Sequence, residues 1–110
     1  MTYQSPDHSL ETIDNTLYLK GSFRLKLPAH YAPIFHPLKE RMTNQEIPIL
    51  NIKEVLFFNS AGIVALAAII ISARDHSLPI IVYYDKYKAW QRRSIVSLER
   101  LWEKMETKGI

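Results

Sequence analysis

The sequence predicts a single α/β domain, built on a mixed sheet of about four strands with three helices. Short β-branched apolar runs alternate with segments of helical periodicity between residues 9 and 105, which is typical of strands joined by helical crossovers. The length of 110 residues is close to the commonest size of one domain. The predicted order is β-β-α-β-α-β-α, with residues 1–8 as an N-terminal tail and residues 9–110 as the domain.

The first structured segment, TIDNTLYLKGSFRLKL, predicts a hairpin of two strands. Asp14-Asn15 has the composition of a tight turn between strands. Leu17, Leu19 and Phe23 fall on one parity, apart from the break at Gly21. The hairpin is therefore expected to bury one face.

The next two segments predict a helix and a buried strand. The segment HYAPIFHPLKERMTNQ has apolar residues at helical spacing. Pro33 suits a first helical turn, whereas Pro37 lacks the N–H that an interior position would use. We therefore expect a kinked or two-part helix, followed by a short strand over residues 47–52 with apolar side chains on both faces.

The most apolar part of the chain, residues 55–73, predicts the end of a strand followed by a buried helix that is apolar nearly all round over residues 63–73, and no membrane span. Polar residues and a glycine interrupt it, and the longest run free of polar side chains covers residues 61–71. That run is too short to cross a bilayer, which takes about 20 residues. Ser60 stands where the N-cap of the helix is expected, and the small residues Ala61 and Gly62 allow the start of the helix to approach its neighbours closely.

The C-terminal part predicts one more strand and one more helix. The run LPIIVYYD is short and nearly all apolar, as expected for a buried strand. A last helix is expected from about residue 88 to residue 105, with no strand after it. Its apolar stripe is Ile95, Leu98, Leu101, Trp102 and Met105.

The segment ILNIKEVLFFNSAG, which ends at Asn59-Ser60-Ala61-Gly62, resembles the STAS family of sulfate transporter and anti-sigma factor antagonist domains. Those domains typically have two hydrophobic residues, Asp and Leu, a loop with spaced Val and Phe, then Asp-Ser-Ser-Gly and an apolar helix. The predicted order of elements also follows the family over residues 9–105. The segment AWQRRSIVSLERL looks like a cyanobacterial-type branch of STAS-like sequences.

The resemblance implies a cytoplasmic regulatory module that binds other proteins in signalling or transcription regulation. In regulatory members, the residue equivalent to Ser60 is phosphorylated by a partner kinase. Asn59 stands here for the usual Asp, and Ala61 for the second Ser. The expected partners are a kinase-like anti-sigma factor or another sensor protein, together with a phosphatase, and a homodimer is compatible. The expected contact residues are Phe58, Asn59, Ser60, Ala61 and Gly62.

The sequence offers no pattern for catalysis, metal binding or a cofactor, so no enzyme is predicted. There is no cysteine, and the four histidines lack ligand spacing. No glycine-rich loop follows a strand, so phosphate cradles of the P-loop and Rossmann kinds are missing. The absence of cysteine fits a reducing compartment, and the N-terminus lacks the pattern of a secretory signal.

Three alternatives stay open. Residues 86–110 carry seven basic and three acidic side chains, so Arg92, Arg93, Arg100 and Lys104 could bind nucleic acid, although the interleaved glutamates favour a solvated helix face. The domain could also be a constitutive dimerisation unit without a switch. Finally, Ser60 could act only as an N-cap, and Asn59 could bond to the backbone instead of a partner.

Overall fold

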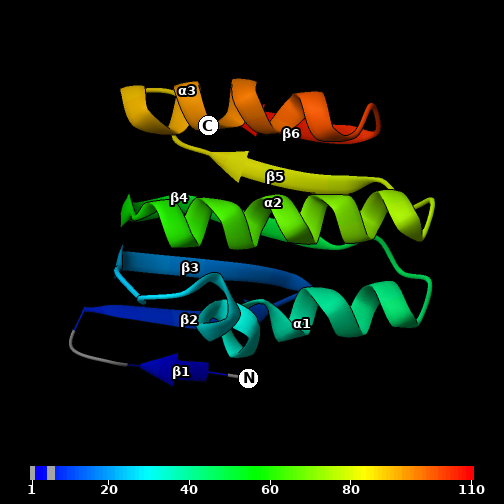
Figure 1. Cartoon of the computed structure of the whole chain (residues 1–110), viewed down its shortest axis with the longest axis horizontal. Coiled ribbons are helices and arrows are strands. Elements are labelled where there is room, and N and C mark those ends of the chain that lie inside the picture. Colours follow the sequence, from blue (N-terminus) through cyan, green and yellow to red (C-terminus); the bar gives the residue numbers. More distant parts are fainter. Residues whose placement is uncertain (1, 5–6) are drawn as a thin grey trace.

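The computed structural model describes residues 2–4 and 7–110, and within them the chain forms one six-stranded mixed sheet with three α-helices (Figure 1). The α/β class is confirmed, with more strands than the four expected. In chain order the elements are β1 (Thr2–Gln4), β2 (His8–Ile13), β3 (Thr16–Phe23), a 3₁₀ turn (Pro28–Tyr31), α1 (Ala32–Thr43), β4 (Ile49–Phe58), α2 (Ser60–Asp75), β5 (Ile80–Tyr84), α3 (Ala89–Leu98), a second 3₁₀ turn (Glu99–Leu101) and β6 (Met105–Gly109).

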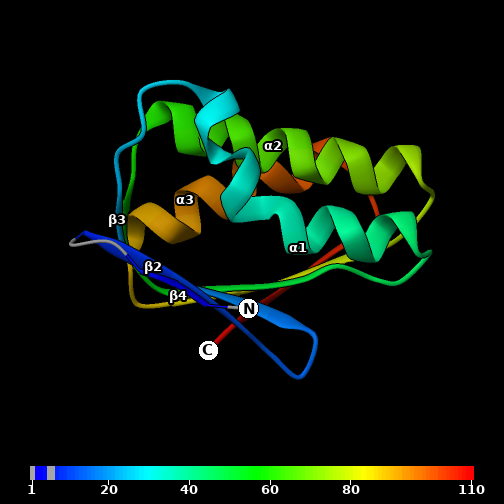
Figure 2. The same ribbon diagram turned by 90° about the horizontal axis from the view of Figure 1, so that it is seen from below.

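The strands lie side by side in the order of the chain. β1, β2 and β3 are antiparallel neighbours, whereas β3, β4, β5 and β6 run parallel to one another. Right-handed crossovers between strands that always step in the same direction place every helix on the same side. Figure 2 shows α1, α2 and α3 together on one face of the sheet.

The predicted hairpin is confirmed as β2 and β3. Asp14 and Asn15 have φ values of 48° and 68°, as a two-residue type I′ turn requires. Leu17, Leu19 and Phe23 are buried on the helix side. Gly21 has a φ of 96°, and an added Cβ would collide with the carbonyl of Asp7. The break in the apolar pattern therefore marks a position that only glycine fits.

The first helix has two parts, but it divides before Pro33 and runs unbroken through Pro37, where the break was expected. A 3₁₀ turn starts at Pro28, and α1 then begins with Pro33 in its first turn and holds Pro37 in its interior. Four apolar side chains of α1 enter the core: Ile34, Phe35, Leu38 and Met42.

β4 is longer than the predicted strand, and the side chain of Gln91 completes its hydrogen bonding. Its pairing with β5 ends at Asn51, although the strand continues to Phe58. Beyond Asn51, the buried Gln91 donates its amide to the carbonyls of Ile52 and Val55 at 2.8 and 3.0 Å, and its oxygen accepts from the N–H of Asp85 at 2.8 Å. Gln91 thus supplies partners that a neighbouring strand would otherwise provide.

The prediction for the C-terminal segment was wrong, because α3 ends at Leu98 and the chain returns to the sheet as β6. Trp102 is extended, and its indole N–H donates to the carbonyl of Leu78 at 2.8 Å. Met105 is buried as the first residue of β6. Its spacing from Leu98 fits a helix, but burial in a strand satisfies the same apolar side chain.

The N-terminal tail predicted for residues 1–8 is partly a strand. Thr2–Gln4 pairs with β2 as an edge strand, and β2 itself begins at His8. Residues 1, 5 and 6 of the predicted tail lie outside the described residues. A three-residue strand carries little apolar periodicity, so no sequence pattern marked it.

Replacing Gln91 by Leu should lower the free energy of unfolding by at least about 2 kcal/mol, because three backbone groups lose their buried partner. Urea unfolding measures the change. Arg93→Leu, at an exposed position of the same helix, is the control and should stay within about 0.5 kcal/mol of the wild type. Equal effects of both substitutions would contradict this role of Gln91.

Candidate functional site

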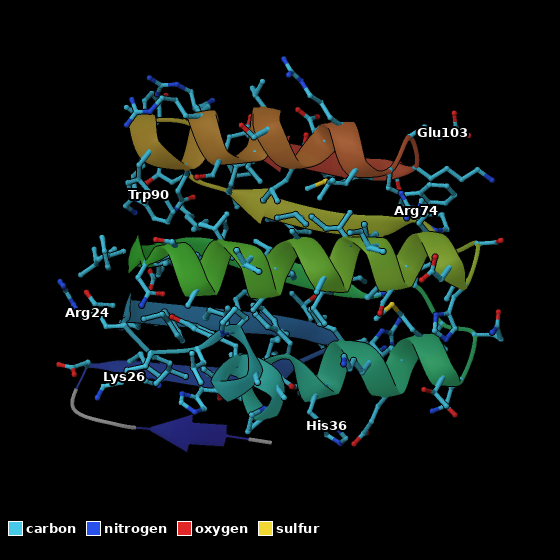
Figure 3. The ribbon with its side chains drawn as sticks, viewed as in Figure 1. Arg24, Lys26, His36, Arg74, Trp90 and Glu103 are labelled. Carbon is cyan, nitrogen blue, oxygen red and sulfur yellow. The ribbon has the colours of Figure 1, made fainter. Side chains whose placement is uncertain are left out.

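The candidate site lies at the carboxyl edge of the parallel strands, where α2 begins. β3, β4 and β5 all end at this edge, so the loops that follow them meet there. Figure 3 shows Arg24 and Lys26 of the loop after β3, and Trp90 of α3, at the same end of the molecule as the start of α2. The site is therefore built from segments that are distant in sequence.

Asn59 is the N-cap of α2, so the prediction that Ser60 caps the helix was wrong. The Oδ1 atom of Asn59 accepts from the backbone N–H of Gly62 at 2.9 Å and from the hydroxyl of Tyr31 at 2.8 Å. Asparagine and serine are both favoured N-caps, so the pair Asn59-Ser60 did not settle which one serves. Asparagine serves as the cap here because its acceptor and its donor are separate atoms on a longer side chain, so that Oδ1 binds the helix start while Nδ2 binds another segment.

The donor side of Asn59 explains why an amide suits this position better than a carboxylate. Its Nδ2 atom donates to the carbonyl of Leu25 at 2.8 Å. A carboxylate has no donor and would bring an oxygen against the oxygen of Leu25. Of the two interpretations left open for Asn59, the structure shows the bond to the backbone.

Tyr31 completes this network from below the loop. Its side chain is fully buried, and its hydroxyl accepts from the N–H of Leu25 at 3.2 Å while donating to Asn59. Burial raises the pKa of the Tyr31 hydroxyl, and the bond from Leu25 partly offsets this. The neutral phenol therefore holds the loop after β3 against the start of α2.

Ser60 is the first residue of α2, and its side chain is exposed. Its hydroxyl makes no hydrogen bond to the part of the chain that the structure describes. The position at the first turn carries the positive end of the helix dipole, which favours negative charge. Because Asn59 provides the cap, the hydroxyl of Ser60 has no structural role in starting the helix.

The other predicted contact residues are placed less favourably for a partner. Phe58 and Gly62 are buried, while Asn59 and Ala61 are partly buried. A Cβ at Gly62 would lie 2.8 Å from the ring of Phe58 and 3.0 Å from the hydroxyl of Tyr31. Gly62 is therefore small for reasons of packing.

Exposed apolar side chains next to Ser60 were missed from the sequence. Leu56 is 64% exposed, Phe57 39% and Val64 54%. For Phe57 and Phe58 the sequence predicts one core and one half-buried residue, as observed. Leu56 and Val64 were missed because a loop was expected between the strand over residues 47–52 and Asn59, and the helix after it was expected to be buried nearly all round. In β4 the strict alternation of buried and exposed residues is interrupted: Val55 and Phe58 are buried, and the two residues between them are both exposed. A pattern of apolar residues that breaks this alternation could have indicated the exposed side chains.

The surroundings of this tip are basic. The guanidinium of Arg24 lies 4.5 Å from the centroid of the Phe57 ring, and Lys86 and Lys88 follow β5 at the same edge. Asp85 forms an ion pair with Lys88 at 3.0 Å. The backbone N–H of Tyr87, and then Lys88, lower the pKa of the Asp85 carboxyl. That carboxylate is thus engaged within its own loop.

Comparison of the sequence with protein-family models and with curated proteins finds no match. Among the described residues, none of the helices is long and apolar enough to cross a membrane. The same residues contain no group of three or more histidine, aspartate or glutamate side chains arranged to hold a metal ion.

Asn59→Asp should lower the free energy of unfolding by about 1–2 kcal/mol at neutral pH. Repulsion from the carbonyl of Leu25 should exceed the roughly 0.3–1 kcal/mol gained by negative charge at a helix start. Protonation of the new carboxyl restores a donor, so the loss should shrink in acid. Urea unfolding at neutral and mildly acidic pH tests this, with Asn15→Asp in the exposed turn as the control.

Gly62→Val should destabilise the domain by about 1–3 kcal/mol, because the new side chain overlaps Phe58 and Tyr31. Ala68→Val places the same residue at an exposed position of α2 and should cost only about 0.5 kcal/mol from helix propensity. Thermal or urea unfolding of both variants gives the comparison. If Gly62→Val lowers the free energy of unfolding no more than Ala68→Val does, the close packing at the tip does not contribute to stability.

Proposed function

We propose that this chain is a non-enzymatic cytoplasmic regulator that binds a partner protein through the start of α2, and that phosphorylation of Ser60 controls the binding. This is the mode of action of anti-sigma factor antagonists in the STAS family, which the sequence resembles. The observation that carries the proposal is the division of roles at the tip: Asn59 caps the helix, which leaves the exposed hydroxyl of Ser60 available to a kinase.

The surface around Ser60 suits a protein partner. Phe57 precedes Ser60 by three residues and Val64 follows it by one helical turn, and both side chains are exposed. An aromatic anchor buried at the centre of a contact supplies much of its binding energy. The rigid Asn59 network holds the loop after β3 beside these side chains, so the surface needs little ordering on binding. The partner would be a kinase-like anti-sigma factor or another sensor protein, and a phosphatase would reverse the modification.

A phosphate on Ser60 would act on binding more than on stability. It adds about 1.5–2 negative charges, which the start of α2 tolerates because of the helix dipole. A partner packed on Phe57 and Val64 would have to bury that charge, and an unpaired buried charge costs several kcal/mol. Modification should therefore release the partner while the domain stays folded.

The nucleic-acid alternative lacks the continuous basic helix on which it depended. Arg92 and Arg93 lie in the first half of α3, whereas Arg100 belongs to the 3₁₀ turn and Lys104 to the turn before β6. The guanidinium of Arg92 also donates to the carbonyl of Lys86. No contact in the described residues favours nucleic-acid binding over protein binding. Nucleic-acid binding would also show a steep fall of affinity with rising salt concentration.

Ser60→Asp should leave the melting temperature nearly unchanged and weaken partner binding at least about tenfold, or 1.4 kcal/mol. Ser60→Ala should bind normally, stop responding to kinase and ATP, and keep its stability within about 0.5 kcal/mol, since Asn59 supplies the cap. The partner is recovered with the tagged protein from the native cells, and its affinity is measured by calorimetry.

Ser97→Asp is the matched control, because it adds the same charge at an exposed serine of α3 away from the tip. It should leave partner binding unchanged. Mass spectrometry of the protein from its native cells tests the modification itself. Unmodified Ser60 under all growth conditions, together with normal binding by Ser60→Asp, would rule out the switch.

A further inference from the structure

The face of the sheet opposite the helices is open. In Figure 2, α1, α2 and α3 lie on one side of the sheet, and no helix of the described residues lies on the other. The open face carries a row of side chains that runs straight across five strands, because residues paired in a sheet point to the same side. In strand order from β2 to β6, this first row is Glu11, Tyr18, Asn51, Tyr83 and Lys108.

A second row runs beside it, two residues along each strand. It is mainly apolar, and Ile13 at its end is 45% exposed. In the same strand order the second row is Ile13, Thr16, Ile49, Ile81 and Glu106. The two rows together cover roughly 20 Å by 15 Å of sheet surface. An aromatic and aliphatic surface of this kind, with charges at its ends, is typical of an interface.

The first row has a nearly symmetric composition about Asn51. Tyrosines flank Asn51 on both sides, and charges of opposite sign stand at the two ends. We propose that the open face binds a second copy of this chain, with the two-fold axis parallel to β4 and midway between the two sheets. This axis reverses the order of the rows, so Glu11 faces Lys108 of the second copy, Tyr18 faces its Tyr83, and Asn51 faces its Asn51.

The shape of the open face is also compatible with the proposed dimer. A hollow of about 360 Å³ lies on the β2–β4 half, with Glu11, Tyr18 and Asn51 among its lining residues. On the other half, the Tyr83 ring carries the ammonium of Lys108 at 5.8 Å from its centroid. The two-fold axis brings this aromatic and cationic pair of each copy over the hollow of the other. Face-to-face sheets pack about 10 Å apart, which such side chains can fill.

Of the other charged side chains near the axis, Glu54 is paired within its own chain, whereas Lys53 lines the same hollow and meets the Lys53 of the second copy across the axis, which weakens the association. Glu54 lies on β4, and its carboxylate is 3.7 Å from the ammonium of Lys20. Two faces of these dimensions cover only about 600 Å² between them, which is below the range of standard specific interfaces, so the dimer should be weak. Strands of both copies run in the same direction about this axis, so both α2 tips would face the same side. This inference does not depend on phosphorylation at Ser60.

Sedimentation velocity over a concentration series tests the dimer, with the folding of each variant checked by circular dichroism. Glu11→Lys and Lys108→Glu should each weaken self-association at least about tenfold, because each places like charges at both ends of the interface. An equimolar mixture of the two variants should associate as the wild type does, because both end contacts then regain opposite charges. Asn51→Asp should also weaken the dimer, by placing two carboxylates across the axis.

Glu103→Lys, in the turn before β6, makes the same charge change outside the open face and should leave the dimer intact. A wild-type chain that remains monomeric up to millimolar concentration would overturn the proposal. A dimer that ignores Glu11→Lys, Lys108→Glu and Asn51→Asp would also overturn it, and would point to pairing through a strand edge or the helices. Failure of the mixture to restore association would reject the proposed axis.

Discussion

The side chain of Asn59 is the interaction on which the arrangement of the site depends. Its carbonyl oxygen and amide together bind the first turn of α2, the hydroxyl of Tyr31 and the carbonyl of Leu25. The segment from Leu25 to Tyr31, which is distant along the chain from Asn59, is thereby held against the start of α2 at the carboxyl edge of β4. A smaller cap could start the helix, but it could not also bind the loop after β3.

This network separates two roles that serine could have combined. Because Asn59 caps the helix, Ser60 is placed at the exposed first turn without being needed for folding. A side chain that the fold does not require can be modified at little structural cost, and the helix dipole makes added negative charge tolerable there. In the function proposed above, the exposed Phe57 and Val64 belong to the contact that a change at Ser60 would affect.

The topology of the sheet explains the two surfaces that remain open. Strands added in chain order with right-handed crossovers put all helices on one face, so the other face keeps its cross-strand rows exposed. At the carboxyl edge, β5 stops before β4 does, and the buried Gln91 supplies hydrogen bonds that a longer strand would have made. One polar side chain thus allows β4 to continue to the site.

The sequence by itself determined the α/β class, the hairpin turn at Asp14-Asn15, the two-part first helix and the start of α2 within one residue of Ser60, because each follows from local periodicity or turn chemistry. Only the tertiary structure decided that Asn59 caps α2, since its amide must also reach Leu25. The structure likewise decided that the segment after Leu98 returns as β6. Met105 could be buried either as part of a helix or as part of a strand. The strand forms because it can pair with the edge of β5 that would otherwise be free.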